Sequence, residues 1–316
     1  MEHSDLLEER GILYPLRGIT TGTQRNLLYE WTKPDAFDPG QPTWAWLKRT
    51  IKQSDCDILL LSSENFSALP SYSRVPARIH RFFRQFGMTV QVFAFFRPQH
   101  ELLNSMYAQR VRLLNTSQKF RLWVSGEQTK SIYLYRSIVN LWDRDKEFFV
   151  TVLPFTHDVK YAGALPRFIT AAGLSDHLGD TALMGTWSRR NRTPGSKTVE
   201  VFRRLARRGG RKKYWAYLHQ IRRFVLTEGW NRGWDRTPFN AVDDALRRRV
   251  TRRFELGNAH LANLYFDDTW ENTFAAELTK PLSVNEYDRH RSSADDERDI
   301  QELVAEVYAR FGADPI

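Results

Sequence analysis

The chain has 316 residues, of which 41% are hydrophobic, and its 47 basic and 37 acidic residues give a net charge of +10. This composition predicts an ordinary globular protein with a sizeable core and an anionic partner. The single cysteine, Cys56, excludes an internal disulfide and a cysteine-rich metal cluster. The sequence has no apolar run of membrane-spanning length, and its start, MEHSDLLEER, is acidic, unlike a signal peptide, so we expect a cytoplasmic protein.

The N-terminal region predicts a short helix that begins at Ser4 and ends at Gly11, followed by an extended ILYP segment. Helical patterns at QRNLLYEW and TWAWLKRTIKQ precede the run CDILLLSSE, which is typical of a buried parallel strand. Glu64 then lies at the carboxyl end of that strand, where ligands bind in open α/β sheets. Its carboxylate can act as a general base, or it can cap the next helix or pair with an arginine.

The segment 88–109 is the most informative stretch of the chain. Its apolar run VQVFAFF predicts an interior strand of a parallel sheet, and Pro98 suits the first turn of a helix that follows. Arg97 therefore lies at the end of a strand and offers several donors to a phosphate, to which Ser105, two helical turns later, can add a hydroxyl. The alternative is a surface ion pair of the arginine and a serine that bonds its own backbone.

Further along, a helix at RVPARIHRFFRQF predicts a βαβ crossover between these two strands, which must be right-handed if they are parallel. The run EFFVTVLPF predicts a third buried strand, between amphipathic helices at KSIYLYRSIVNLWDRD and ALPRFITAAGL. Three parallel strands with helices between them predict an α/β fold. The acidic segment SSADDERDIQELVAEVYARF predicts a final amphipathic helix.

Positive charge is concentrated between Val201 and Thr227, where nine Lys or Arg residues occur without an acidic residue. Such runs are most often the solvated faces of helices. Aromatic residues at 214, 215 and 217 leave open an anionic surface as partner, which can be single-stranded nucleic acid, an anionic glycan or lipid headgroups.

Several of these segments resemble, in the same order, a bacterial branch of the sulfotransferases that use 3'-phosphoadenosine 5'-phosphosulfate. The branch pattern Arg-x-Gln-x-x-x-x-x-Ser-x-Tyr-x-Gln is filled by Arg97, Gln99, Ser105, Tyr107 and Gln109. Further matches between about residues 6 and 270 are Leu7, Gly11, Ile12, Tyr14, Pro15, Ser62, Ser63, Glu64, Phe66, Leu165, Phe168, Gly173, Leu174, Asn191, Thr193, Asn258, Leu261, Ala262 and Tyr265.

The resemblance implies a P-loop-type parallel sheet flanked by helices, in a single domain with its sheet core in 1–186 and a mainly helical, basic part in 187–316. It implies that a sulfuryl group is transferred from the nucleotide to a hydroxyl of a carbohydrate or glycolipid acceptor, without a metal. The resemblance assigns nucleotide binding to four residues and the catalytic base to a fifth. These are Arg97, Ser105, Asn191 and Thr193 for the nucleotide, and Glu64 for the base.

The sequence departs from the family pattern at two places. Gln24 and Arg25 stand where the family commonly has a histidine, which removes one candidate base or substrate ligand. The family's first strand and its loop, Pro-Lys-x-Gly-Thr-Thr, which holds the 5'-phosphosulfate, are not found, and the Gly-Thr run at 18–24 has no lysine. We therefore expect the chain as printed to be inactive and marginally stable, with at most the 3'-phosphate half of the site, because neighbouring strands would keep unpaired backbone groups.

Two other classes of function remain. One is a glycosyltransferase or nucleotide kinase on a similar sheet, although the sequence lacks Gly-x-x-x-x-Gly-Lys-Ser/Thr and an acidic metal-binding pair at a strand end. The other is a non-enzymatic basic protein that binds nucleic acid or an anionic surface, for which steep salt dependence on generic DNA or RNA is expected.

Overall fold

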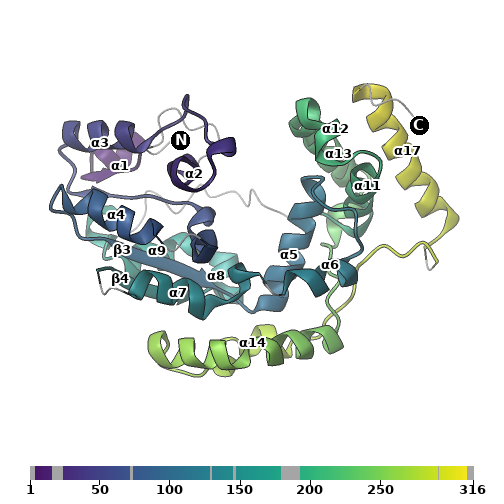
Figure 1. The fold of residues 1–316 in the computed structure, drawn as a ribbon. Helices are drawn as coiled ribbons and strands as arrows, with labels where there is room; N and C mark the ends of the chain where they lie inside the picture. Colours follow the sequence, from purple (N-terminus) through teal and green to yellow (C-terminus); the bar gives the residue numbers. More distant parts are fainter. Residues whose placement is uncertain are drawn as a thin grey trace. The chain divides into compact units, whose positions relative to one another are not determined.

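The computed structural model describes residues 4–15, 24–71, 74–128, 130–144, 147–178, 193–290 and 292–311. It shows a mixed α/β protein that is mostly helical (Figure 1). The chain divides into two compact units, each made of three segments. Unit 1 comprises Met1–Phe96, Ser131–Trp187 and Gly257–Thr273, and unit 2 comprises Arg97–Lys130, Ser188–Leu256 and Phe274–Ile316.

Unit 1 contains every strand found in the described ranges. These strands are β1 (Ile12–Leu13), β2 (Ile58–Leu59), β3 (Gln91–Phe96) and β4 (Phe149–Pro154). The α-helices are α1 (Ser4–Glu8), α2 (Arg25–Thr32), α3 (Trp44–Gln53), α4 (Val75–Arg84), α7 (Tyr135–Asp143), α8 (His157–Ala162), α9 (Ala164–Ala171), α10 (Ser175–Leu178) and α15 (Trp270–Thr273). Three short 3-10 helices are η1 (Pro34–Ala36), η2 (Glu64–Ser71) and η3 (Ser131–Tyr133).

The strands form two separate parallel sheets of two strands each. β1 pairs with β2, with Ile12 opposite Ile58, and β3 pairs with β4 over six residues, beginning with Gln91 opposite Phe149. Figure 1 shows β3 and β4 side by side as the longest strands of unit 1. The predicted strands are thus present and parallel, and the extended ILYP segment contributes a fourth.

The prediction that the strand in 88–109 is an interior strand of a parallel sheet is wrong for the described residues, where the strands form two separate pairs. β2 is only two residues long and half-buried, and most side chains of β3 are half-buried as well. Because each sheet has two strands, each strand is an edge strand, which apolar composition alone does not reveal. Helix α4 also links β2 to β3 in the other sheet, so it is not a crossover within one sheet.

Each strand therefore has one row of backbone groups without a strand partner. In β2, the amides of Ile58 and Leu60 donate to β1, which directs those of Leu59 to the opposite edge. In β3, the same alternation directs the backbone groups of Phe93 and Phe95 away from β4. Within the described residues these outward groups make no backbone hydrogen bond.

Helix α9 packs against both sheets. The ring of Phe168 lies edge-on to Phe93 of β3, with their centroids 5.2 Å apart. The same side chain packs against the core cluster of Ile12, Leu174 and Leu178, against which Ile58 of β2 also packs. Phe168 therefore links α9 to β3 and to the core beside β1.

Aromatic packing joins the helices on the N-terminal side of unit 1. Thr43 caps α3 by accepting a hydrogen bond from the Trp46 amide at 3.1 Å, in agreement with the predicted helix start. Trp44 at the first position of α3 stacks on Trp31 of α2 at 4.2 Å and meets Phe82 of α4 edge-on. These contacts bury the apolar faces that the helical periodicity predicted.

The regular elements of unit 2 in its described residues are helices, apart from an isolated β-bridge between Asn240 and Asn285. Its helices are α5 (Gln99–Arg112), α6 (Phe120–Glu127), α11 (Ser196–Arg207), α12 (Gly210–Lys213), α13 (Leu218–Asn231), α16 (Ala275–Thr279) and α17 (Ala294–Phe311), with the 3-10 helices η4 (Trp215–Tyr217) and η5 (Trp234–Arg236). Helix α14 (Asp244–Tyr265) contributes residues to both units. None of the helices in the described ranges combines the length and apolar character that crossing a bilayer requires.

The unpaired strand edges lead to a measurable prediction. The amides of Val92 and Ala94 donate to β4, whereas those of Phe93 and Phe95 point to the outer edge, because only even-numbered residues of β3 bond to β4. We expect Val92 and Ala94 to be protected from hydrogen exchange, and Phe93 and Phe95 to exchange at least about tenfold faster. Residue-resolved exchange by NMR measures this. Equal protection of all four amides would show that the outer edge of β3 is paired.

Candidate functional site

The candidate site begins where β3 ends. Arg97 directly follows the last residue of β3 and precedes α5, as the sequence predicted. Its Nη2 donates a hydrogen bond to Ser105 Oγ at 2.5 Å, so the two predicted phosphate ligands are in direct contact. Ser105 Oγ in turn donates to the Leu102 carbonyl at 3.1 Å. Both side chains are half-buried, which keeps them accessible to an anion.

Helix α5 is held firmly around these two residues. On one face Tyr107 is buried against the rings of Phe120 and Trp123, and its hydroxyl donates to the Gln118 carbonyl at 2.7 Å. Burial raises the pKa of Tyr107, so this hydroxyl remains a donor. The packing of α5 against its neighbours therefore fixes the position of Ser105 relative to Arg97.

A second predicted ligand segment lies close to α5. The Asn104 side chain donates to the Phe239 carbonyl at 3.1 Å and accepts from the Ala241 amide at 3.0 Å. The amide of the same Phe239 donates to the Pro194 carbonyl at 2.8 Å. Pro194 follows Thr193, and Asn104 precedes Ser105. Phe239 therefore bonds to the neighbours of both predicted ligands and bridges their two segments. Asn191, the fourth predicted nucleotide ligand, lies outside the described residues.

The turn after Thr193 is built for close approach to η5. A Cβ atom at Gly195 would lie 1.9 Å from the Trp234 carbonyl oxygen, so only glycine fits there. The Asp235 carboxylate accepts from the Gly195 amide and from the Thr198 hydroxyl, both at 2.7 Å. This carboxylate thus caps α11 from η5 and occupies the helix end that an anion could otherwise use.

His100 is a buried residue of the site that sequence reasoning missed. It is 2% exposed on the first turn of α5, and neither ring nitrogen has a hydrogen-bond partner among the described residues. Burial lowers the pKa of His100 to about 4. The positive charges of Arg247, Lys280 and Arg97 lower it further, and the negative charge of Glu101 opposes them only in part. The ring is therefore neutral near pH 7, and the positive charges around this turn are those of Arg247, Lys280 and Arg97. The only available sequence signal was its position three residues after Arg97.

Glu64, the predicted base, lies in unit 1 as the first residue of η2. Its side chain is exposed, and within the described residues it makes no hydrogen bond or ion pair. Gln24 fixes the neighbouring strand end through two hydrogen bonds to Ser62. Its side-chain Oε1 accepts from the Ser62 backbone amide at 2.8 Å, and its own backbone amide donates to the Ser62 carbonyl at 3.2 Å. Gln24 thus has a structural role at this strand end.

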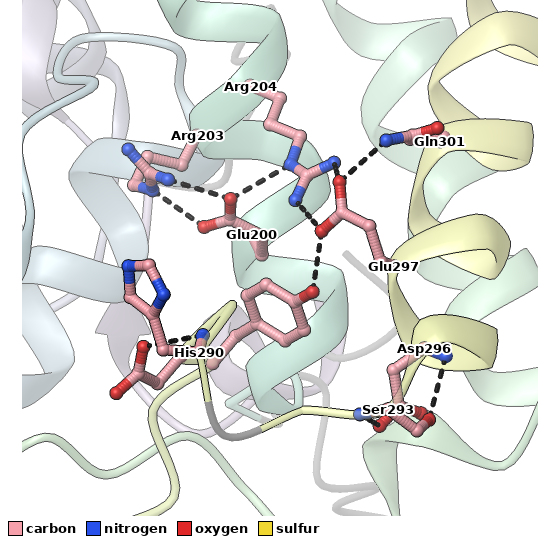
Figure 2. A network of polar contacts seen from close by, with 10 residues as sticks. Glu200, Arg203, Arg204, His290, Ser293, Asp296, Glu297 and Gln301 are labelled. Carbon is pink, nitrogen blue, oxygen red and sulfur yellow. Dashed lines mark hydrogen bonds and ion pairs between the residues drawn. The ribbon is translucent and has the colours of Figure 1, made fainter.

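Part of the predicted basic surface is consumed inside unit 2. Figure 2 shows Glu200 of α11 between Arg203 and Arg204, with bonds of 2.6 to 2.9 Å. Arg204 also binds Glu297 of α17 through two bonds of 2.8 and 2.7 Å, and Tyr287 donates to the same carboxylate. Arg204 lowers the pKa of Glu297 to about 2. Arg204 therefore joins α11 to α17, and Arg203 bonds to Glu200 on its own helix and to the Ser117 carbonyl, so both charges are used within unit 2.

The chemistry available at the Arg97–Ser105 pair is anion binding. No group of three or more His, Cys, Asp and Glu side chains in the described ranges is arranged to hold a metal ion. Comparison with protein-family models, curated proteins and solved structures finds no match to this chain. The candidate site therefore rests on its own geometry.

The pKa of His100 predicts how stability depends on pH. A histidine whose folded pKa lies below its ordinary value of about 6.5 destabilises the folded state as pH falls from there to about 4, because only the unfolded chain takes up the proton. The expected loss from this residue is about 3 kcal/mol of unfolding free energy over that range.

Denaturant unfolding between these pH values tests the assignment. His100→Leu is expected to have a shallower loss of stability than the parent chain, and His219→Leu, at an exposed position on α13, the same loss as the parent. An unchanged slope in His100→Leu contradicts the assignment.

The polar network of Figure 2 predicts a mutational effect. Glu297→Gln is expected to lower the free energy of unfolding by about 2 kcal/mol, because a largely buried guanidinium loses a charged partner. Glu302→Gln, at an exposed position of the same helix, is expected to change it by less than about 0.5 kcal/mol. Chemical denaturation measures both values, and equal effects would show that the network contributes nothing specific.

Proposed function

We propose that this chain binds a nucleotide that carries a 3'-phosphate, and that its reaction is that of the sulfotransferases with 3'-phosphoadenosine 5'-phosphosulfate as donor. The contact between Arg97 and Ser105 carries the proposal. A guanidinium and a hydroxyl held together at the end of a strand give a phosphate both charge and directional donors. The resemblance quoted from the sequence assigns these two positions to the 3'-phosphate.

The proposed binding step requires a small rearrangement at these two side chains. Ser105 now accepts from Arg97 and donates to a backbone carbonyl. A phosphate oxygen can accept from both groups if the serine hydroxyl turns away from that carbonyl, which a hydroxyl does by rotation about one bond. Thr193 supplies a second hydroxyl from the neighbouring segment, and the neutral His100 leaves Arg97 as the charged ligand.

The proposed reaction transfers the sulfuryl group to a hydroxyl of a carbohydrate or glycolipid acceptor. The acceptor oxygen bonds to sulfur as the bond from sulfur to the bridging phosphate oxygen breaks, and 3'-phosphoadenosine 5'-phosphate leaves. We assign to Glu64 the removal of the acceptor proton, a role that its exposed carboxylate without a partner allows. We propose a P-loop-type arrangement of the strands for the same reason of resemblance.

The 5'-phosphosulfate needs a site of its own, and the printed sequence shows no loop of the family type for it. A test through binding is therefore more decisive than a test through turnover. It also separates this proposal from the alternatives, because neither a kinase of adenosine monophosphate nor a general nucleic-acid binder requires the additional 3'-phosphate.

The test compares 3'-phosphoadenosine 5'-phosphate with adenosine 5'-monophosphate by isothermal titration. The parent chain is expected to prefer the doubly phosphorylated nucleotide, and Arg97→Ala to reduce that preference by about 10- to 100-fold, the value of a charge-assisted phosphate contact. Binding of the monophosphate is expected to change little. Arg110→Ala, which removes the same charge from the last turn of α5, serves as the control. Equal weakening of both nucleotides by Arg97→Ala would refute the assignment.

A further inference from the structure

The segment that joins α11 to α13 presents basic and aromatic side chains together. We call residues 207–217 the basic–aromatic tip. Its exposed basic residues are Arg207, Arg208, Arg211 and Lys213, and its exposed aromatic residues are Trp215 and Tyr217. Trp215 is 63% exposed and Tyr217 48%, which is unusual for side chains of this size.

The tip has a defined conformation. Gly210 has a φ of +60°, in the left-handed region that glycine adopts readily, and there the chain turns from α11 into α12. Tyr214 is 1% exposed and lies against the ring of Tyr308 on α17, with centroids 6.5 Å apart. Because Tyr214 anchors the backbone, its neighbours Lys213 and Trp215 are both directed to solvent.

The charge of the tip is not neutralised by the protein. Between residues 201 and 227 the sequence has no acidic residue. None of the four exposed basic side chains pairs with a carboxylate in the described part of the chain. Instead, Arg211 lies over the ring of Trp215 at 4.5 Å and Arg208 over that of Tyr308 at 5.5 Å. This differs from Arg203 and Arg204, whose charges are used within unit 2.

We propose that the basic–aromatic tip binds the anionic headgroups of a lipid surface. Tryptophan and tyrosine favour the boundary between headgroups and acyl chains, because each has an apolar ring and a polar group. Basic side chains next to them attract anionic lipids, and the two contributions together bind where either one alone is weak. The inference is independent of the nucleotide site.

The arrangement of the rings favours a lipid surface over single-stranded nucleic acid. Trp215 and Tyr217 lie two residues apart at one end of α13, the end next to α12 in Figure 1. They form one compact point of contact, which is sufficient for insertion among headgroups. Nucleic-acid binding uses aromatic platforms spaced along a basic groove that follows several nucleotides.

Co-sedimentation with vesicles tests the proposal. The full chain is expected to bind vesicles of phosphatidylcholine with phosphatidylserine and not vesicles of phosphatidylcholine alone. Trp215→Ala, and separately the double variant Arg211→Gln with Lys213→Gln, are each expected to weaken binding by at least about fivefold. Trp230→Ala is the matched control, because Trp230 is 55% exposed and lies about 20 Å along α13 from the tip.

Thermal unfolding of each variant checks that the fold is retained. We expect it to be retained because the substituted residues are exposed. The proposal is overturned if phosphatidylserine vesicles do not bind, or if Trp230→Ala weakens binding as much as the tip variants do. A single-stranded RNA oligomer is measured in parallel. Binding of that RNA through Arg211, Lys213 and Trp215, without binding to vesicles, would overturn the proposal in favour of a nucleic-acid surface.

Discussion

The backbone groups of a strand are satisfied on only as many edges as the strand has neighbours, and this constraint governs unit 1. Its strands pair two by two, and within the described residues the backbone groups of Leu59 in β2 and Phe93 in β3 point to edges that have no neighbouring strand. Phe168 of α9 contacts Phe93 of β3 and packs against the core cluster of Ile12 of β1, so side-chain packing links this helix to both sheets. Unit 1 therefore depends on side-chain packing where a continuous sheet would use its backbone ladder.

In unit 2, which is rich in positive charge, ion pairs hold the helices together. Glu200 and Glu297 each bind Arg204, so two carboxylates and a guanidinium join α11 to α17. Asp235 caps α11 at its other end. Arginines that are close in sequence thus serve opposite purposes: Arg204 bonds helices, whereas Arg211 remains exposed on an aromatic ring.

The candidate site follows from how firmly α5 is held. Asn104 and Tyr107, one turn apart on the helix, donate to the backbone carbonyls of Phe239 and Gln118, and Ser105 lies between them in sequence. Preorganisation of this kind matters for anion recognition, because a ligand gains most from donors that do not have to be ordered on binding. His100, buried and neutral beside them, leaves the charge of the site to Arg97.

The sequence by itself determined the local elements and the pairing of Arg97 with Ser105. These features depend on short-range geometry: a strand-like run, a proline in a first helical turn and a spacing of eight residues. They predicted β3, α5 and the positions of Arg97 and Ser105. It also determined that the tail forms a helix, found as α17. Only the tertiary structure decided that the strands are edges, that Arg203 and Arg204 are consumed by carboxylates, and that Thr193 approaches α5 through Phe239. The reason is physical: periodicity records whether a side chain prefers burial, whereas strand partners, ion pairs and the meeting of distant segments depend on contacts between residues far apart in the chain.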